Sequence, residues 1–265
     1  MNPMKVRLKV PGSCGEFVQG FFQGAPLLIT CPVEIFTTVT VSDEFSGVAG
    51  LGEKSLAMLE KFSLPKNFGV RLVSDLPRAK GMASSSADLA AVAKAVSVAL
   101  GQELSAEKIS ELAASIEPTD GIFFSGIVAM NPVTGKFVKN IRVAENFTVA
   151  IFDYGGEVDT LKFNRRSDFQ IPALAENLIF ELVEESARAN QSILYKKNLP
   201  EITAFAKNLG AVTVNAAHSG TVIGIFFRAG DTAVDAKILE IGRRFEFIKF
   251  LTKTRLTGGG FYGEI

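Results

Sequence analysis

The sequence predicts an α+β protein of two lobes that divide near residue 150. Its 265 residues suit one to two domains, and 47% hydrophobic with 21% charged residues is an ordinary globular composition. Strand-like and helical segments are mixed, and a new cycle of strand and helix begins at Phe147. This order fits an α+β arrangement with domains at residues 1–150 and 151–265.

The first segments of the chain are expected to be strands. MKVRLKV alternates apolar and basic side chains, and Pro11 with Gly12 is expected to break that strand. LLITCPVEIFTTVTV is rich in β-branched residues. After a glycine-rich stretch come a short amphipathic segment near LAMLEKF and a further strand at FGVRLV.

Two helices and a hairpin complete the first half. Helical periodicity begins after residue 81 and runs to Gly101, which is a plausible C-terminal stop. Ser105 is the expected N-cap of a second helix, which must end before Pro118. GIVAMNP and KFVKNIRV then resemble the two strands of a hairpin.

The second half repeats the alternation. FTVAIFDYG is typical of a strand, residues 155–167 form a polar linker, and a long helix is expected at about 172–195. The remaining predicted elements are a short helix near EITAFAKNL, two strands in AVTVNAAHSGTVIGIFF, a helix near TAVDAKILEIGRRF and strands through FIKFLTKTRLT.

Composition excludes several classes of protein. Lys+Arg and Asp+Glu number 28 each, so the formal net charge is zero and gives no overall attraction to nucleic acid or to an anionic membrane surface. No apolar run approaches the length of a membrane span, and the first residues lack the apolar core of a signal peptide. Cys14 and Cys31 form no CxxC, so we expect a cytoplasmic protein with free thiols. The single histidine, His218, excludes an HExxH metal site.

The segment RAKGMASSSAD at residues 78–88 places a glycine and three serines before an alanine-rich helix. Helix N-termini present unpaired amides and the positive end of the macrodipole, so this one suits a phosphate. Gly81 and Ala83 would let a phosphate approach the backbone closely. The hydroxyls of residues 84–86 can donate hydrogen bonds to it or coordinate Mg²⁺, and Lys80 adds a positive charge. The alternative is an ordinary serine N-cap, although one cap needs no companions. We expect the serines to cap the helix and thereby form the phosphate socket.

The segment SIEPTD carries two carboxylates. Pro118 stops the preceding helix, so Glu117 and Asp120 lie close together at its exit. Beside a phosphate site, one suits Mg²⁺ and the other the substrate hydroxyl. Read alone, a solvated turn is the simpler interpretation, but the serine loop favours the catalytic one.

Two glycine-containing segments supply candidate substrate contacts. Residues 12–16 suit a turn against a ligand, and Glu16 could pair with the ammonium of an amino-acid substrate, whereas Ser13 could equally serve a plain turn. His218, Ser219 and Gly220 lie between strands, where a structural hydrogen bond and a tight turn are the alternatives. Candidate partners for a substrate carboxylate are Arg7, Arg78, Arg165, Arg166 and Arg255.

Three motifs in combination resemble the GHMP kinases, a family that includes galactokinase, homoserine kinase and mevalonate kinase. PRAKGMASSSA is similar to the family's phosphate loop P-x3-G-L-G-S-S-A-A, PGSCGEFVQG to its first motif, and AAHSGTVIGI to its third. Ala83 stands where the family's loop has its second glycine, so the backbone there must take a conformation that a residue with a Cβ can adopt. The resemblance implies a ribosomal protein S5 domain 2-like N-terminal lobe, a ferredoxin-like C-terminal lobe and an active site between them.

The resemblance also implies roles for individual residues. ATP would bind Lys80, Gly81, Met82, Ala83, Ser84, Ser85 and Ser86. Mg²⁺ would bind Ser85 and Glu117. Asp120 would be the catalytic residue, either as a base or as a group that orients the hydroxyl. The substrate would contact Ser13, Glu16, His218, Ser219 and Gly220. PGSCGEFVQG, KGMASSSAD, SIEPTD and AHSG are most similar to the L-threonine kinase branch, which implies synthesis of threonine phosphate for cobalamin.

Alternative interpretations stay open. They are a kinase for another small alcohol such as homoserine, a catalytically silent nucleotide sensor, and a serine hydrolase built on Ser84, Ser85 or Ser86 with His218, although no G-x-S-x-G elbow is present. The expected partners are ATP and a small amino acid with a side-chain hydroxyl. The sequence is also compatible with a homodimer. GLGEKS at residues 50–55 resembles a P-loop, but Glu53 separates its glycine from Lys54, so it is not a Walker A motif.

Overall fold

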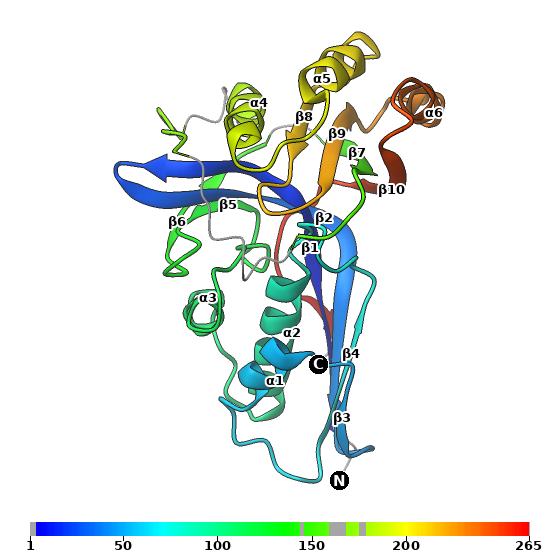
Figure 1. Ribbon diagram of the computed structural model, residues 1–265. Coiled ribbons are helices and arrows are strands. Elements are labelled where there is room, and N and C mark those ends of the chain that lie inside the picture. Colours follow the sequence, from blue (N-terminus) through cyan, green and yellow to red (C-terminus); the bar gives the residue numbers. More distant parts are fainter. Residues whose placement is uncertain (1–3, 144–145, 159–167, 175–178, 265) are drawn as a thin grey trace.

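A computed structural model describes residues 4–143, 146–158, 168–174 and 179–264, and within them the strands form two sheets (Figure 1). The seven-stranded sheet has the order β11 (Tyr262–Glu264), β1 (Lys5–Phe22), β2 (Ala25–Ser42), β4 (Gly69–Ser74), β3 (Gly47–Ala49), with β5 (Ile127–Met130) pairing with β2 and with β6 (Phe137–Ile141). The four-stranded sheet has the order β10 (Lys249–Arg255), β7 (Phe147–Asp153), β9 (Val222–Arg228), β8 (Thr213–Ala216). The predicted α+β class is confirmed.

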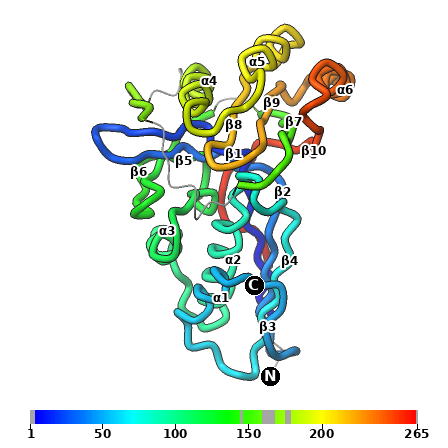
Figure 2. The backbone as a smooth tube through the Cα atoms, in the orientation of Figure 1, coloured from blue at the N-terminus to red at the C-terminus, as the bar shows by residue number. Residues whose placement is uncertain are grey.

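The long hairpin of β1 and β2 joins the two halves of the molecule. It pairs with β4 near one end, through residues 37–42, and with β5 near the other, through residues 28–29. In Figures 1 and 2 the hairpin runs from the lower sheet to a tip below α4 (Ile179–Ala189). The predicted break at Pro11 and Gly12 is wrong, because β1 continues through them with a shift of register. Such a bulge absorbs the missing proline N–H and bends the strand instead of ending it.

Three helices cover one face of the seven-stranded sheet: α1 (Glu53–Leu59), α2 (Ser84–Ala99) and α3 (Ala106–Ala114). The predicted helices after residue 81 and after Ser105 are confirmed, and the Ser105 side chain accepts a hydrogen bond from the amide of Lys108. Most of α2 is buried, and its alanine and valine side chains are small enough for it to lie close to β1 and β2. Its N-terminus is thereby held firmly in place.

The second half places α4, a short 3-10 helix (Asn190–Ser192), α5 (Leu199–Asn208) and α6 (Val234–Arg244) against the four-stranded sheet (Figure 1). The helix expected at 172–195 is wrong at both of its ends. Residues 172–174 are not helical, because the amide of Ile171 and the carbonyl of Phe169 bond to Phe21 and hold this segment extended along β1. The helical segment ends at Ser192.

The predicted boundary near residue 150 falls inside β7 and stays a prediction. No strand is predicted for the last residues, yet β11 pairs antiparallel with β1 and so returns to the first sheet. Within the described ranges, no helix is both long enough and apolar enough to span a lipid bilayer.

Candidate active site

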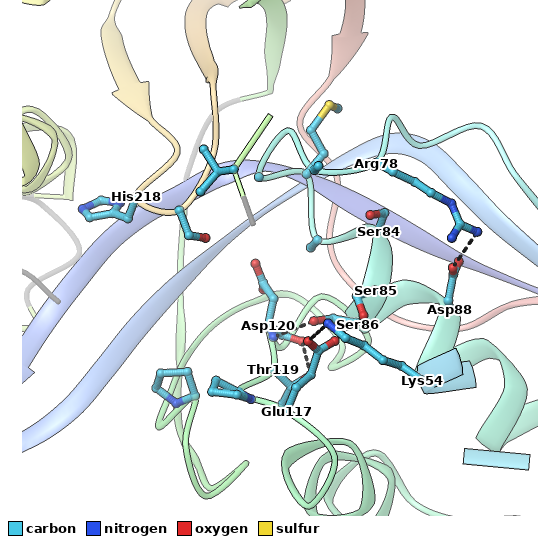
Figure 3. A pocket seen from close by; sticks show the side chains of 18 of the residues that line it. Lys54, Arg78, Ser84, Ser85, Ser86, Asp88, Glu117, Thr119, Asp120 and His218 are labelled. Carbon is cyan, nitrogen blue, oxygen red and sulfur yellow. Dashed lines mark hydrogen bonds and ion pairs between the residues drawn. The ribbon is translucent and has the colours of Figure 1, made fainter. Parts of the chain in front are cut away.

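A cleft of about 1100 Å³ opens beside the N-terminus of α2 (Figure 3). Its walls come from segments that are far apart in the chain: β1, α1, the loop before α2, residues 117–120 and the loop between β8 and β9. The bends of β1 and the short loops at the sheet ends bring these segments together. The cleft is therefore the place where the three sequence motifs meet.

The loop before α2 has an unusual backbone conformation. Gly81 has φ 79°, and Ala83, the N-cap residue, has φ 53° and ψ 26°. The predicted serine cap is wrong, because Ala83 takes the cap position without any side-chain hydrogen bond and residues 84–86 form the first turn of the helix. Ala83 adopts a left-handed conformation, which a Cβ disfavours and which glycine, the residue usual at this position of the loop, adopts readily. The amides of the first turn are thus not used by a capping side chain.

Both other motifs hold this loop through backbone hydrogen bonds. The amide of Ser13 donates to the carbonyl of Met82 at 3.0 Å, and that of Gly15 to Gly81 at 3.1 Å. From the loop between β8 and β9, the amide of Thr221 donates to the carbonyl of Lys80 at 3.0 Å. A Cβ on Gly220 would collide with the backbone of Lys80 and Gly81. The glycines therefore allow three backbones to pack directly against each other.

The Lys80 ammonium does not line the cleft. Its Nζ lies 2.8 Å from Asp153 Oδ2 and donates to the carbonyl of Gly156 at 2.6 Å. Burial would raise the pKa of Asp153, but Lys80 and the hydrogen bond from the Gly155 amide lower the pKa below its usual value. Lys80 therefore ties the loop to the end of β7.

Glu117 lies beside the first turn of α2. Its Oε1 accepts a hydrogen bond from the Ser85 hydroxyl, and its Oε2 accepts one from the Lys54 ammonium (Figure 3). Among the described residues no three His, Cys, Asp or Glu side chains form a metal-binding group. One carboxylate and one hydroxyl nevertheless suit Mg²⁺ bound to a nucleotide, since Mg²⁺ is commonly held by one or two carboxylates and phosphate oxygens.

Asp120 has a buried carboxyl group with one unsatisfied oxygen. Its amide donates to Ser86 Oγ at 3.0 Å, whereas no hydrogen-bond partner is present for Oδ1 among the described residues. Burial and the charge of Glu16 raise the pKa of Asp120 well above its usual value, although two backbone amides oppose this rise. A buried, unsatisfied acceptor with a raised pKa is suited to take a hydrogen bond or a proton from a ligand.

A buried polar network forms the other end of the cleft. Glu16 Oε2 accepts a hydrogen bond from the amide of His218 at 3.0 Å, and the ring Nδ1 of His218 lies 3.3 Å from the same oxygen. His218 Nε2 lies 2.9 Å from Ser186 Oγ, and Lys196 Nζ donates to the carbonyl of Ala217 at 2.7 Å. Burial would raise the pKa of Glu16, but His218 and Lys196 lower the pKa below its usual value. Glu16 therefore stays a carboxylate at the cleft wall.

Comparison with known proteins points to one family. Residues 51–126, which include α1, the loop and Asp120, match the family model "GHMP kinases N terminal domain". In these residues the chain is similar to the GHMP kinases. An L-threonine kinase from Citrobacter freundii is 29% identical to this protein over 254 residues, which are 85% of this chain and 87% of the relative. One from Salmonella typhimurium is 28% identical over 244 residues, 81% and 80% of the two chains.

A solved homoserine kinase from Cytophaga hutchinsonii has the same fold as this protein. The TM-score is 0.65 at 15% identity, and the match covers 98% of this chain and 97% of that one. The predicted resemblance to the GHMP kinases and the two-lobed α+β fold are thus confirmed. The matches also identify the chain as a phosphotransferase of the kinase type.

The predicted site residues of this protein fall into two groups. Those that line the cleft are Glu16, Gly81, Met82, Ala83, Ser84, Ser85, Ser86, Glu117, Asp120, His218 and Ser219. Ser13, Lys80 and Gly220 lie behind the loop and hold it in position.

The candidate arginines are also separated. Arg78 lines the cleft and lies 3.7 Å from Asp88. Arg7 is in β1 and Arg255 in β10, and neither lines the cleft. Arg165 and Arg166 lie outside the described residues.

Several residues that line the cleft had no role predicted from the sequence, and Lys54, Glu157 and Asn190 are among them. Lys54 belongs to the GLGEKS segment that resembled a P-loop, so a weak signal existed for it. Glu157 and Asn190 carry no local motif, because only the tertiary fold brings them to the cleft.

Proposed function

We propose that this protein transfers the γ-phosphoryl group of ATP to the side-chain hydroxyl of L-threonine, giving O-phospho-L-threonine for cobalamin synthesis. The observation that carries the proposal is the unsatisfied Asp120 oxygen in a cleft that also contains the phosphate loop. The choice of L-threonine is supported by two relatives of that name that match more than four fifths of this chain.

The loop and α2 supply the proposed nucleotide site. The backbone of residues 81–86 and the N-terminus of α2 favour the phosphates of ATP, since unpaired amides and the helix dipole attract negative charge. Ser85 and Glu117 would hold Mg²⁺, whose chemistry is to neutralise charge on the transferred phosphoryl group. Ser13 and Gly220 then act indirectly, by fixing the loop.

Asp120 is the proposed group at the acceptor hydroxyl. Oδ1 accepts the hydrogen bond of the threonine hydroxyl, and its raised pKa suits it to take the proton as the hydroxyl oxygen forms a bond to phosphorus and ADP leaves. Glu16 would pair with the substrate ammonium, and His218 and Ser219 would line the substrate site. Positioning and electrostatics then supply most of the rate enhancement.

Other features remain part of the proposal. Residues 1–150 and 151–265 are the proposed lobes, the proposed location is cytoplasmic, and a homodimer is the proposed assembly. Size-exclusion chromatography with light scattering measures the last of these directly.

Substrate selection is tested by measuring ADP release and phosphorylated product with L-threonine, L-homoserine and L-serine. We expect the highest kcat/KM with L-threonine. Absence of product with L-threonine would overturn the assignment, and higher kcat/KM with L-homoserine would replace it by the homoserine alternative.

Variants test the residue roles. D120N should lower kcat by about 10²–10⁴-fold, the usual contribution of general acid–base catalysis, with little change in ATP binding. E117Q should lose metal-dependent nucleotide binding, whereas E60Q, a matched change at an exposed residue just after α1, should not. Retention of kcat in D120N would exclude Asp120 from the chemistry, and a wild-type protein that binds ATP without turnover would indicate the silent sensor.

A further inference from the structure

Lys54 occupies a place in the cleft that the proposed function does not explain. It lies in the first turn of α1, and its Nζ donates to Glu117 Oε2, while Ser85 donates to the other oxygen of the same carboxylate. The Lys54 side chain is 29% exposed and that of Glu117 is 9% exposed. The ammonium therefore neutralises a largely buried carboxylate, and this carboxylate is the proposed ligand of Mg²⁺.

An ammonium and a divalent cation compete for one carboxylate. Both positive charges on Glu117 would repel each other at short range, so binding of the metal displaces the lysine. The other basic residues around the loop have their own partners, since Arg78 pairs with Asp88 and Lys80 with Asp153. Lys54 is the cation that metal binding would leave without its carboxylate.

The backbone around Lys54 is fixed while its side chain has room to move. Gly50 has φ 80°, and a Cβ there would collide with the carbonyl of Leu72 in β4, so this glycine packs the start of the segment against the sheet. α1 packs against α2, whose first turn carries Ser85. A flexible four-carbon stem on this fixed base lets the ammonium move within the cleft.

We propose that Lys54 is a phosphate-binding residue that the metal releases: it neutralises Glu117 before the nucleotide binds, and it moves to a nucleotide phosphate when Mg²⁺ takes Glu117. The inference rests on the proposed function, because it requires a metal on Glu117 and a nucleotide at the loop. Its consequence is that metal and ATP bind with positive coupling, since each lowers the cost of binding the other.

The coupling is tested with Mn²⁺, whose binding to the full chain is followed by electron paramagnetic resonance with and without a non-hydrolysable ATP analogue. Without nucleotide, K54M should bind Mn²⁺ about 30-fold more tightly, the factor for removing one unit charge about 4 Å from a divalent ion in a water-like dielectric. With nucleotide, K54M should bind the analogue about tenfold more weakly, because a charge-assisted hydrogen bond to phosphate is lost. The sign of the effect thus differs between the two conditions.

The controls separate this inference from the proposed function. K54R keeps the charge and should bind Mn²⁺ like the wild type, K61M changes an exposed lysine just after α1 and should have no effect, and K54Q repeats the neutral substitution. Unchanged Mn²⁺ affinity in both K54M and K54Q without nucleotide, or unchanged affinity for the analogue, would overturn the role of Lys54. If instead E117Q binds Mn²⁺ with the analogue as well as the wild type does, the proposed metal site itself is wrong.

Discussion

Gly81 should not tolerate a side chain, and the structure gives the size of the effect. A Cβ on Gly81 would lie 2.7 Å from the Cβ of Ala217 and 2.8 Å from the Cα of Gly220, whereas ordinary contacts begin at 3.4 Å. In G81A the loop must therefore move by about 0.7 Å away from residues 217–220. That shift weakens the hydrogen bond from the Thr221 amide to the Lys80 carbonyl. Since a displacement of about 1 Å can reduce a rate by about 10²-fold, we expect kcat/KM for ATP to fall by about 10- to 100-fold.

A matched variant separates the collision from backbone strain. Gly81 and Gly24 have φ 79° and 80°, so alanine pays a similar conformational cost of about 1 kcal/mol at both, but nothing lies within 4 Å of a Cβ on Gly24. Steady-state kinetics and urea unfolding of G81A and G24A provide the comparison. The reasoning is refuted if G81A keeps kcat/KM within twofold of the wild type, or if G24A loses as much activity as G81A.

Three further predictions concern ionisable groups and thiols. K80M and D153N should each lower the free energy of unfolding by about 1–3 kcal/mol in urea melts and raise the KM for ATP, while K108M, in an exposed pair, should change stability by at most about 0.5 kcal/mol. Burial lowers the pKa of Lys196 to about 8 from 10.5, so between pH 8 and 10.5 the unfolded chain holds a proton that the folded chain has released. The free energy of unfolding should therefore rise with pH in this window, and K196M should lack this rise. Burial raises the pKa values of Cys14 and Cys31, so neither thiol should react with dithiobis(nitrobenzoate) within minutes until the protein is denatured.

Local signals predicted the elements whose structure depends on local interactions. α2 and α3 follow their helical periodicity, and Ser105 caps α3 because its acceptor and donor are three residues apart. The same rule failed for residues 84–86, since the Ser85 hydroxyl binds Glu117, which is 32 residues away, and the cap position passes to Ala83. A sequence window of one helix contains no information on that partner.

The sequence motifs predicted most of the residues that line the site, but not the ion pairs that its charged residues form. Glu117 and Asp120 lie in the cleft as expected, because a proline and a helix end place them together. Lys80 was expected at the phosphate, but it pairs with Asp153 at the end of β7, a strand of the other sheet. Lys54 had only a failed P-loop pattern to indicate it, and its contact with Glu117 spans 63 residues. Contacts of this range are set by tertiary packing, which single-sequence patterns do not report.

The pairing of β11 with β1 bears on how the chain folds during synthesis. β1 leaves the ribosome early, but its outer edge at residues 7–9 finds its partner only when residues 262–264 have been made. Until then a nascent chain presents open hydrogen-bonding groups along a strand next to the core, and such edges recruit other chains. A stop codon just before Tyr262 would leave every proposed site residue in place. It should nevertheless produce aggregated protein, because the last strand closes the first sheet.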